Sequence, residues 1–579
     1  MNLIKIITVG FLISLFWYLF MPIMALDNPN LYWFLSMLSC IFFIISGRFK
    51  KDRFGDIQYT WSNFSSASLV VFMVTILILI VGGFISWSWP NETKYYELIG
   101  DVNTRDFESH VAPIDQSKII IIDEETAARL GEKTLVADAE KSVVGSQVVI
   151  GDYWLQQVNG NLYYVAPTLH RSYWKYRKNK EGTEGYIMVN AVNEKDVQYV
   201  DEHKIKYQPN AFFKDNLYRH LYLNGYSTTY LNQPEFEINE QGHPYWVFAR
   251  YERTIGFSGK QVNGIVLVHA TTGEIEEYDT NDAPLWVDRI QPVEFIEQQL
   301  GYWGDLVEGY WNWQDLNKKR ITSGIVMTYG QDGRCYYYTG VTSVGKDGAT
   351  IGFITVDSRT KQVTMYRIAG ATEERGMSSA QGAVQEKGYV ASFPRMYNIN
   401  GIPTYVMALK DREGLIKLVA MVSVENYETV AIGETVKKTL RQYQSKLNSS
   451  FADLVINENE IRTITVGQVI RLRQEARSGL VYLWVQDVSK IITVDSDIYP
   501  EVMLTEPGDK VAIRLFESED ITASAEFFDN LILTFEVSNQ QLQLEYELAE
   551  PTEYNADKQL IPETKEQREE KKSKKANNF

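Results

Sequence analysis

The chain has 579 residues, with 57 Lys and Arg against 74 Asp and Glu, which gives a formal net charge of −17. Hydrophobic residues make up 45% of the chain, enough for the cores of several domains of about 100–200 residues each. The acidic balance argues against a nucleic-acid-binding surface. Two cysteines exclude a disulfide framework and, with six histidines, leave little material for a zinc site.

Three apolar segments open the chain. Residues 6–26, 31–47 and 67–89 contain no charged side chain, and their lengths are 21, 17 and 23 residues. A helix needs about 20 apolar residues to cross a bilayer. We therefore expect three N-terminal transmembrane helices, a three-helix anchor over residues 1–89. The alternative for the first segment is a cleaved signal peptide that ends at Ala25.

Basic residues in one short loop indicate the orientation of these helices. The loop after the second segment contains Arg48, Lys50, Lys51 and Arg53. The positive-inside rule places this loop and the N-terminus in the cytoplasm. The prediction is a multi-pass protein of the cell membrane, with residues 90–579 extracytoplasmic. Trp87 and Trp89, next to Pro90, are typical of the aromatic belt at a membrane interface.

Residues 90–449 contain a repeated pattern. A glycine is followed three or four residues later by a tyrosine at Gly160–Tyr163, Gly242–Tyr245, Gly333–Tyr336 and Gly401–Tyr405. Each pair begins two runs of alternating apolar residues, which predict a β-hairpin. The second runs contain Val189, Val268, Val356 and Val424. Helical stretches at 217–224, 292–300 and 378–387, and a shorter one at 124–130, end next to a glycine. We predict about four related α+β units, each a helix plus a β-hairpin.

One of these units carries a recognisable motif. The segment Val268–Tyr278 reads V-x-x-x-T-G-x-I-x-x-Y, and Val356–Tyr366 and Val189–Tyr199 carry weaker versions. This pattern resembles PepSY-like domains of bacterial exported proteins, although Lys361 and Glu194 stand where that family prefers glycine. The resemblance implies small, extracytoplasmic, non-catalytic modules that regulate peptidases or bind other proteins. It supplies no catalytic residue.

The last part of the chain changes character. Residues 450–550 contain short strand-like runs separated by turn signals, including Ser478-Gly479 and Pro507-Gly508-Asp509. We predict a small all-β domain, an OB-like or SH3-like barrel, that caps the repeats, contacts a partner or binds a ligand. Residues 551–579 are polar and densely charged, and we expect a disordered tail.

No short motif in the chain predicts catalysis. Gly340–Lys346 satisfies the pattern G-x-x-x-x-G-K, but Asp347 replaces the hydroxyl residue that would bind magnesium in a phosphate loop. Neither G-x-S-x-G nor H-E-x-x-H occurs. We therefore predict no catalytic, cofactor-binding or metal-binding residue, and no cofactor.

One basic and aromatic segment is a candidate contact surface. Residues 170–180 read HRSYWKYRKNK. Basic side chains beside aromatic rings can bind an anionic polymer or a protein partner. The residues that would make this contact are Arg171, Trp174, Lys175, Arg177 and Lys178. The alternative is that this segment is only the tip of a long hairpin.

Together these patterns predict an α+β protein with four parts: 1–89, 90–449, 450–550 and 551–579. The function that we predict is non-enzymatic. The chain would be a membrane-anchored, extracytoplasmic scaffold or regulator that binds a lipid bilayer and another envelope protein, such as a peptidase or part of a wall-assembly or transfer apparatus. It would bind neither nucleic acid nor nucleotide, and its oligomeric state stays open. The alternatives are an envelope hydrolase or peptidase and a module that binds cell-wall polymer.

Overall fold

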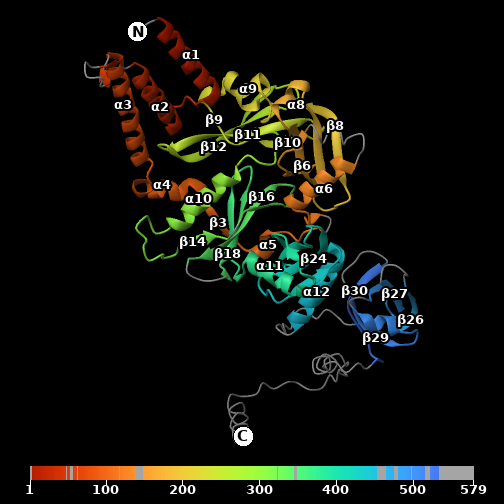
Figure 1. Cartoon of the computed structure of the whole chain (residues 1–579). Coiled ribbons are helices and arrows are strands. Elements are labelled where there is room, and N and C mark those ends of the chain that lie inside the picture. The colour runs from red at the N-terminus through yellow and green to blue at the C-terminus, as the bar shows by residue number, and fades with distance from the viewer. Residues whose placement is uncertain are drawn as a thin grey trace, which may run out of the picture. The chain divides into compact units, whose positions relative to one another are not determined.

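The computed structural model describes residues 3–46, 48–51, 57–60, 63–115, 118–137, 148–322, 324–330, 332–344, 349–452, 465–474, 480–496, 499–515 and 522–533 (Figure 1). It divides into two compact units, Met1–Leu447 and Asn448–Phe579. Several predicted features lie outside the described residues: Arg53 of the basic loop, residues 345–347 of the phosphate-loop pattern, Ser478-Gly479 and the tail 551–579.

The chain begins with helices α1 (Leu3–Phe20), α2 (Pro29–Ser46) and α3 (Asn63–Ile85), and a hairpin of β1 (Arg48–Lys51) and β2 (Ile57–Thr60) joins α2 to α3. The prediction of three transmembrane helices is wrong. In the part of the chain that the structure describes, one helix is long and apolar enough to cross a membrane, over Ser65–Ile85. The predicted multi-pass localisation, with its assignment of the two sides, is wrong for the same reason.

The two rejected spans fail because the apolar part of each helix is too short. The first run, 6–26, is helical only as far as Phe20, so about 15 residues span roughly 22 Å at 1.5 Å per residue. The apolar part of α2 is Pro29–Ile44, which spans roughly 24 Å. Both lengths fall short of a hydrocarbon core of about 30 Å.

Four sheets of the same topology follow these helices. The observed fold is therefore a sheet-rich fold of several sheets, and the predicted fold class with three transmembrane helices is wrong. Each repeat begins with a helix and a short strand. Four longer strands follow and form an antiparallel sheet in which neighbours in the chain are neighbours in the sheet. The short strand pairs with the second of these four strands. Repeat 1 consists of α6 (Glu124–Ala137), β4 (Val148–Ile150), β5 (Trp154–Val158), β6 (Asn161–His170), β7 (Thr183–Asn190) and β8 (Val197–Ile205). Repeat 2 consists of α9 (Leu217–Leu223), β9 (Tyr230–Leu231), β10 (Glu235–Ile238), β11 (Pro244–Ile255), β12 (Ser258–His269) and β13 (Ile275–Asp279).

The other two repeats are built in the same way. Repeat 3 consists of α10 (Val293–Asp305), β14 (Lys319–Ile321), β15 (Val326–Tyr329), β16 (Cys335–Ser343), β18 (Gly352–Asp357) and β19 (Val363–Tyr366). Repeat 4 consists of α11 (Glu373–Gly382), β21 (Val390–Ala391), β22 (Arg395–Ile399), β23 (Ile402–Lys410), β24 (Ile416–Ser423) and β25 (Val430–Gly433). Helix α12 (Val436–Ala452) follows repeat 4.

One hydrogen-bond pattern recurs in all four repeats. The residue after the third long strand donates its N–H to the carbonyl of a residue at the start of the second, as Ala191 does to Leu162. Its own carbonyl accepts N–H groups from the segment that leads into the helix of the same repeat. These residues are Ala191, Ala270, Ser358 and Val424. The four copies are therefore one structural unit, repeated.

This pattern corrects the alignment of the repeats. The glycines of the four turns all have positive φ, between 75° and 86°, which glycine adopts without steric cost. The equivalent aromatic residue is always four positions later, at Tyr164, Trp246, Tyr337 and Tyr405. Each pairs across the sheet with a valine, and in repeat 4 this is Val422 rather than the predicted Val424.

Repeat 3 has one strand more than the others. Strand β3 (Val102–Arg105) comes from before repeat 1 and pairs in parallel with β19, at the end of the strand order β14-β16-β18-β19-β3. Between α3 and β3 the chain forms η1 (Trp89–Asn91), α4 (Glu92–Tyr96) and η2 (Glu97–Ile99). This segment and α10 enclose Ile99, Ile296 and Leu300 in one core. The extra strand therefore gives repeat 3 an edge that the other repeats lack.

The second unit contains a closed five-stranded barrel. Its strands are β26 (Thr465–Gln474), β27 (Leu480–Val485), β28 (Ile491–Asp495), β29 (Lys510–Leu515) and β30 (Thr522–Asn530), in the order β26-β27-β28-β30-β29. Fully buried aliphatic side chains, among them Leu483, Ile492 and Val511, fill its interior with Phe528. Side chains therefore fill the inside of this barrel.

Candidate functional site

Strand β3 is an open edge of the repeat 3 sheet. On one side it pairs with β19, and among the described residues no hydrogen bond reaches its backbone from the other side. Its last three residues, Asn103 to Arg105, are exposed. Unpaired N–H and C=O groups along such an edge can accept a further strand.

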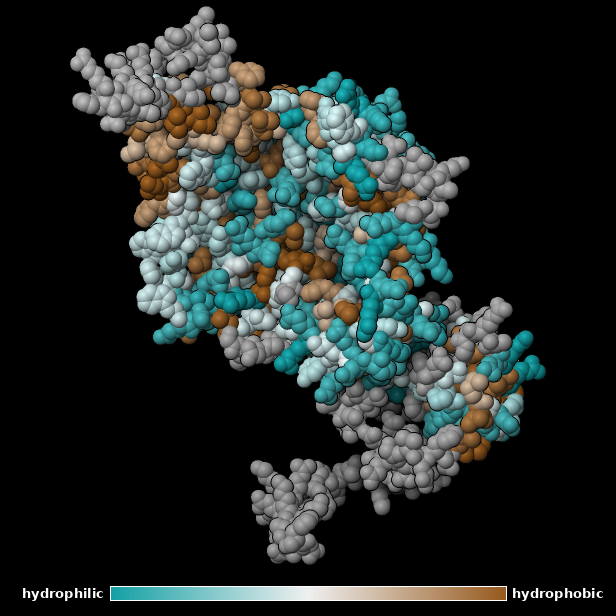
Figure 2. Space-filling model, in the orientation of Figure 1, coloured by the Kyte–Doolittle hydropathy of each residue, from teal (hydrophilic) through white to brown (hydrophobic). Residues whose placement is uncertain are grey.

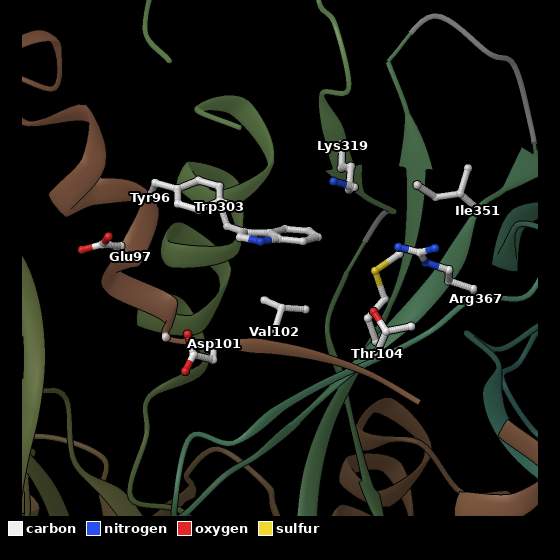
Figure 3. A pocket seen from close by; sticks show the side chains of 11 residues that line it. Tyr96, Glu97, Asp101, Val102, Thr104, Trp303, Lys319, Ile351 and Arg367 are labelled. Carbon is white, nitrogen blue, oxygen red and sulfur yellow. The ribbon is translucent and has the colours of Figure 1, made fainter. Parts of the chain in front are cut away.

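A cavity of about 750 Å³ lies beside this edge (Figure 3). Its lining comes from three distant stretches of chain: residues 96–104, Trp303 with Lys319, and Ile351 with Met365 and Arg367. Val102 and Thr104 line it because alternate residues of a strand point to the same face. The cavity therefore lies over one face of the sheet, the face to which Val102 and Thr104 of β3 point.

Two cations point into this cavity. Figure 3 shows Lys319 and Arg367 reaching toward the indole of Trp303, with Glu97 on its far side. The ammonium of Lys319 lies 4.8 Å from the centre of the Trp303 ring. Burial, and then the charge of Arg367, lower the pKa of Lys319. Neither cation has an ion pair among the described residues, so both charges are available to an anion.

A glycine allows β14 to approach α10 closely enough to place Lys319. Gly304 is buried near the end of α10, and a Cβ atom there would lie 2.2 Å from the carbonyl oxygen of Lys319. No side chain fits into that space without moving the strand. Gly304 is therefore a positioning residue for the lysine over Trp303.

The predicted basic and aromatic segment lies elsewhere, on helix α8 (Tyr173–Lys178) between β6 and β7. Trp174 is 65% exposed, and the guanidinium of Arg177 lies 5.9 Å from the centre of its ring. Arg171 and Lys178 are exposed and Lys175 is half-buried. Four of the five predicted residues thus lie on one short helix and Arg171 lies two residues before it, and their contact with a polymer or a partner stays a prediction.

The structure brings together three histidines that the sequence patterns did not predict as a cluster. His203 on β8, His243 in the turn before β11 and His269 at the end of β12 lie next to one another, with ring centres 4.9 Å apart for the first pair, which meets edge to face, and 5.8 Å apart for the second. They are 40 and 26 residues apart in the chain, so no spacing rule could find them. In the part of the chain that the structure describes, no group of three His, Cys, Asp or Glu side chains is arranged to hold a metal ion. The three histidines therefore form a packing contact between repeat 1, which contains His203, and repeat 2, which contains His243 and His269.

This cluster predicts a loss of stability in acid. Burial, and then His243, lower the pKa of both His203 and His269, against smaller opposing effects of Glu202 and Glu274. The stability that the neutral imidazoles contribute is complete above the ordinary pKa of about 6.5 and is lost as the pH falls through the folded-state pKa. Between about pH 7.5 and 5.5, we expect the thermal midpoint of His243→Gln to fall about 2 °C less than that of the wild type. Equal falls in both proteins would contradict this role.

Comparisons with known proteins add no identification. No protein-family model matches the chain, and no curated protein is significantly similar to it. A levansucrase of B. megaterium aligns at 9% identity over 73% of this chain and 95% of its own, with a TM-score of 0.17. An endo-arabinase from Bacteroides thetaiotaomicron VPI-5482 aligns at 10% identity over 48% of this chain and 74% of its own, with a TM-score of 0.16. Scores this low carry no argument about fold or activity, and the resemblance to PepSY-like domains stays a prediction.

Proposed function

We propose that this chain is a non-enzymatic scaffold or regulator that binds an extended segment of a partner protein along β3 and holds a carboxylate of that segment between Lys319 and Arg367. The observation that carries the proposal is an open strand edge directly beside a cavity with two cations that lack an ion pair among the described residues. In this mode of recognition, main-chain hydrogen bonds supply affinity and side-chain pockets supply specificity.

The geometry of an added strand fits this cavity. A segment paired with β3 would send every second side chain to the face on which Val102 and Thr104 lie. That face is the floor of the cavity, where Trp303 and Met365 offer apolar contact. One carboxylate can contact both cations, since a planar guanidinium and an ammonium can bind its two oxygens together.

The other free edges in repeats 1 and 2 are less suited to this ligand. Strand β13 carries Glu276, Glu277 and Asp279, and β8 carries Asp201 and Glu202. Charged side chains on an edge strand oppose pairing with another chain. Asp201 and Glu202 on β8 and Glu276 on β13 would also repel a ligand that carries a carboxylate, whereas Glu277 and Asp279 are paired with Arg250. The charge pattern thus favours β3.

The test compares three pools of fluorescein-labelled hexapeptides whose random positions exclude Asp and Glu, by anisotropy with the full-length protein in detergent. The first pool has a free C-terminal carboxylate, the second is amidated, and the third is amidated with one fixed Glu. We expect the first or the third pool to bind about tenfold more tightly than the second, because a hydrogen bond to a charged group contributes about 1.5–3 kcal/mol. The pool that binds tells whether the carboxylate is a chain terminus or a side chain.

Two variants decide whether the site is responsible. Lys319→Gln/Arg367→Gln should remove the preference for the carboxylate. Arg320→Gln is the matched control, because Arg320 is exposed and its side chain points away from the cavity on the same strand. The proposal fails if the acid and amide pools bind equally, or if the control lowers the preference as much as the double variant.

A further inference from the structure

Four exposed tryptophans form one cluster at the end of α3. Trp87 and Trp89 follow the helix directly, and the loop after α10 brings Trp311 and Trp313 to them from more than 200 residues away. The ring centres of Trp89 and Trp311 are 6.1 Å apart, and those of Trp311 and Trp313 are 5.5 Å apart. Trp313 is 80% exposed and Trp311 is 58% exposed. The sequence predicted only the first pair as an interfacial belt.

The loop that carries the second pair is held in place. The side chain of Glu92, on α4, accepts a hydrogen bond of 2.8 Å from the backbone N–H of Tyr310. The buried side-chain amide of Asn312 closes the loop by bonding both the carbonyl and the N–H of Leu316, at 2.7 Å and 3.0 Å. These hydrogen bonds fix the backbone of the loop. Its side chains Trp311, Trp313 and Leu316 are exposed although they are apolar or largely apolar.

The end of α3 itself has a fixed position against repeat 2. The tip of the β11–β12 hairpin reaches it, where Ser86 Oγ accepts a hydrogen bond of 2.6 Å from the N–H of Phe257. The Phe257 ring occupies the space above Gly82, so a Cβ atom there would lie 2.1 Å from the ring. The tryptophan cluster therefore has a defined position relative to the apolar helix.

We propose that this cluster is a contact surface for the interfacial layer of a lipid bilayer, and that the Trp311–Trp313 loop enters that layer beside α3. Only 11% of the apolar window of α3 is buried in the protein, and Figure 2 shows hydrophobic residues gathered over the described part of the N-terminal helices. A helix of this kind is stable when lipid covers it. Tryptophan rings gather where such a helix meets the headgroups, because the ring is apolar and its N–H is polar.

The continuity with α3 favours lipid over a protein partner. Trp87 belongs to the cluster and lies two residues from the end of the apolar helix, so whatever surrounds that end also surrounds the cluster. A second copy of the chain or another protein would have to displace the lipid there. This inference does not depend on peptide binding at β3.

The test uses the full-length protein with the fluorophore NBD on a single cysteine, in a Cys40→Ser background that leaves only the buried Cys335. Trp313→Cys reports on the loop. Leu285→Cys is the control, because Leu285 is 88% exposed and follows β13 in repeat 2, whereas the cluster lies at the end of α3 and on the loop after α10. Both proteins are reconstituted in phosphatidylcholine vesicles that contain lipid spin-labelled either at the headgroup or deep in the acyl chain.

We expect headgroup spin labels to quench the fluorophore at position 313 more than deep labels do, and neither label to quench it at position 285. Equal and negligible quenching at both positions would overturn the proposal, since the loop would then face water. Protection from aqueous iodide at position 313 without quenching by lipid would overturn it as well, and would indicate a protein contact.

Discussion

Arg289→Met is expected to destabilise the first unit by about 3–5 kcal/mol, the usual cost when one partner of a buried ion pair is removed. The Arg289 side chain is 2% exposed, and its Nε lies 2.7 Å from Glu235 Oε2. A second carboxylate, Glu237, is fully buried 3.3 Å from its guanidinium. Burial raises the pKa of both glutamates, and Arg289 opposes that shift.

The position of Arg289 makes the effect large. Its guanidinium lies 4.8 Å from the centre of the Trp154 ring of repeat 1, it pairs with two acids of repeat 2, and the next residues lead into repeat 3. Asp288 beside it accepts hydrogen bonds from the N–H of Gln157 and the hydroxyl of Tyr329. Loss of the cation therefore leaves two buried carboxyl groups without their cationic partner at a joint of three repeats.

Urea denaturation of the full-length protein measures this effect. Arg129→Met is the matched control, because the ion pair of Arg129 with Glu125 is exposed and should contribute less than about 1 kcal/mol. The double variant Arg289→Met/Glu237→Gln should regain part of the lost stability, since one of the two carboxyl groups that lost their cation is then replaced by a neutral amide. Equal losses for the two single variants would show that the buried cation is not what holds this joint.

Gly304→Ala is expected to cost about 1–3 kcal/mol and to weaken peptide binding, because the new methyl group would overlap the backbone of β14. The atom that it meets is the carbonyl oxygen of Lys319, which cannot rotate away as a side chain can. The strand has to shift, and Lys319 shifts with it away from Trp303. Both stability and affinity for the carboxylate pool should fall.

A second glycine in α10 provides the control for this prediction. Gly301 is exposed and a Cβ atom there would meet nothing within 4 Å, so Gly301→Ala should raise stability by up to about 1 kcal/mol. Thermal unfolding and peptide anisotropy on the two variants measure both effects. If Gly304→Ala binds the carboxylate pool as the wild type does, Gly304 does not position the lysine.

Local patterns predicted the hairpins of the repeats well, because each is a short-range structure with its own turn. The glycines at the four turns and the aromatic runs after them lie where the first two long strands of each sheet meet. The two-residue error at Val424 arose because apolar residues occur on both faces of a fully buried strand, so alternation does not fix the register there.

The candidate site could not be predicted from such patterns. Strand β3 reads VNTR, which has no strand signature, and it forms only because β19, about 260 residues later, offers a partner. Lys319 and Arg367 form a candidate site only together with Trp303, which lies on another element of the fold. The predicted length of the first apolar helix was wrong for a related reason. The uncharged run 6–26 does not show that the helix ends at Phe20.

Hydrogen exchange at β3 tests the central claim most directly. The full-length protein is compared with and without the tightest-binding carboxylate peptide from the pools, and deuterium uptake is followed over Val102–Arg105 and over the free edge Ile275–Asp279 of β13. A strand added at β3 should slow exchange at its outward N–H groups and leave β13 unchanged. Unchanged exchange at β3 with the peptide bound would contradict strand addition, and with it the function proposed for this edge.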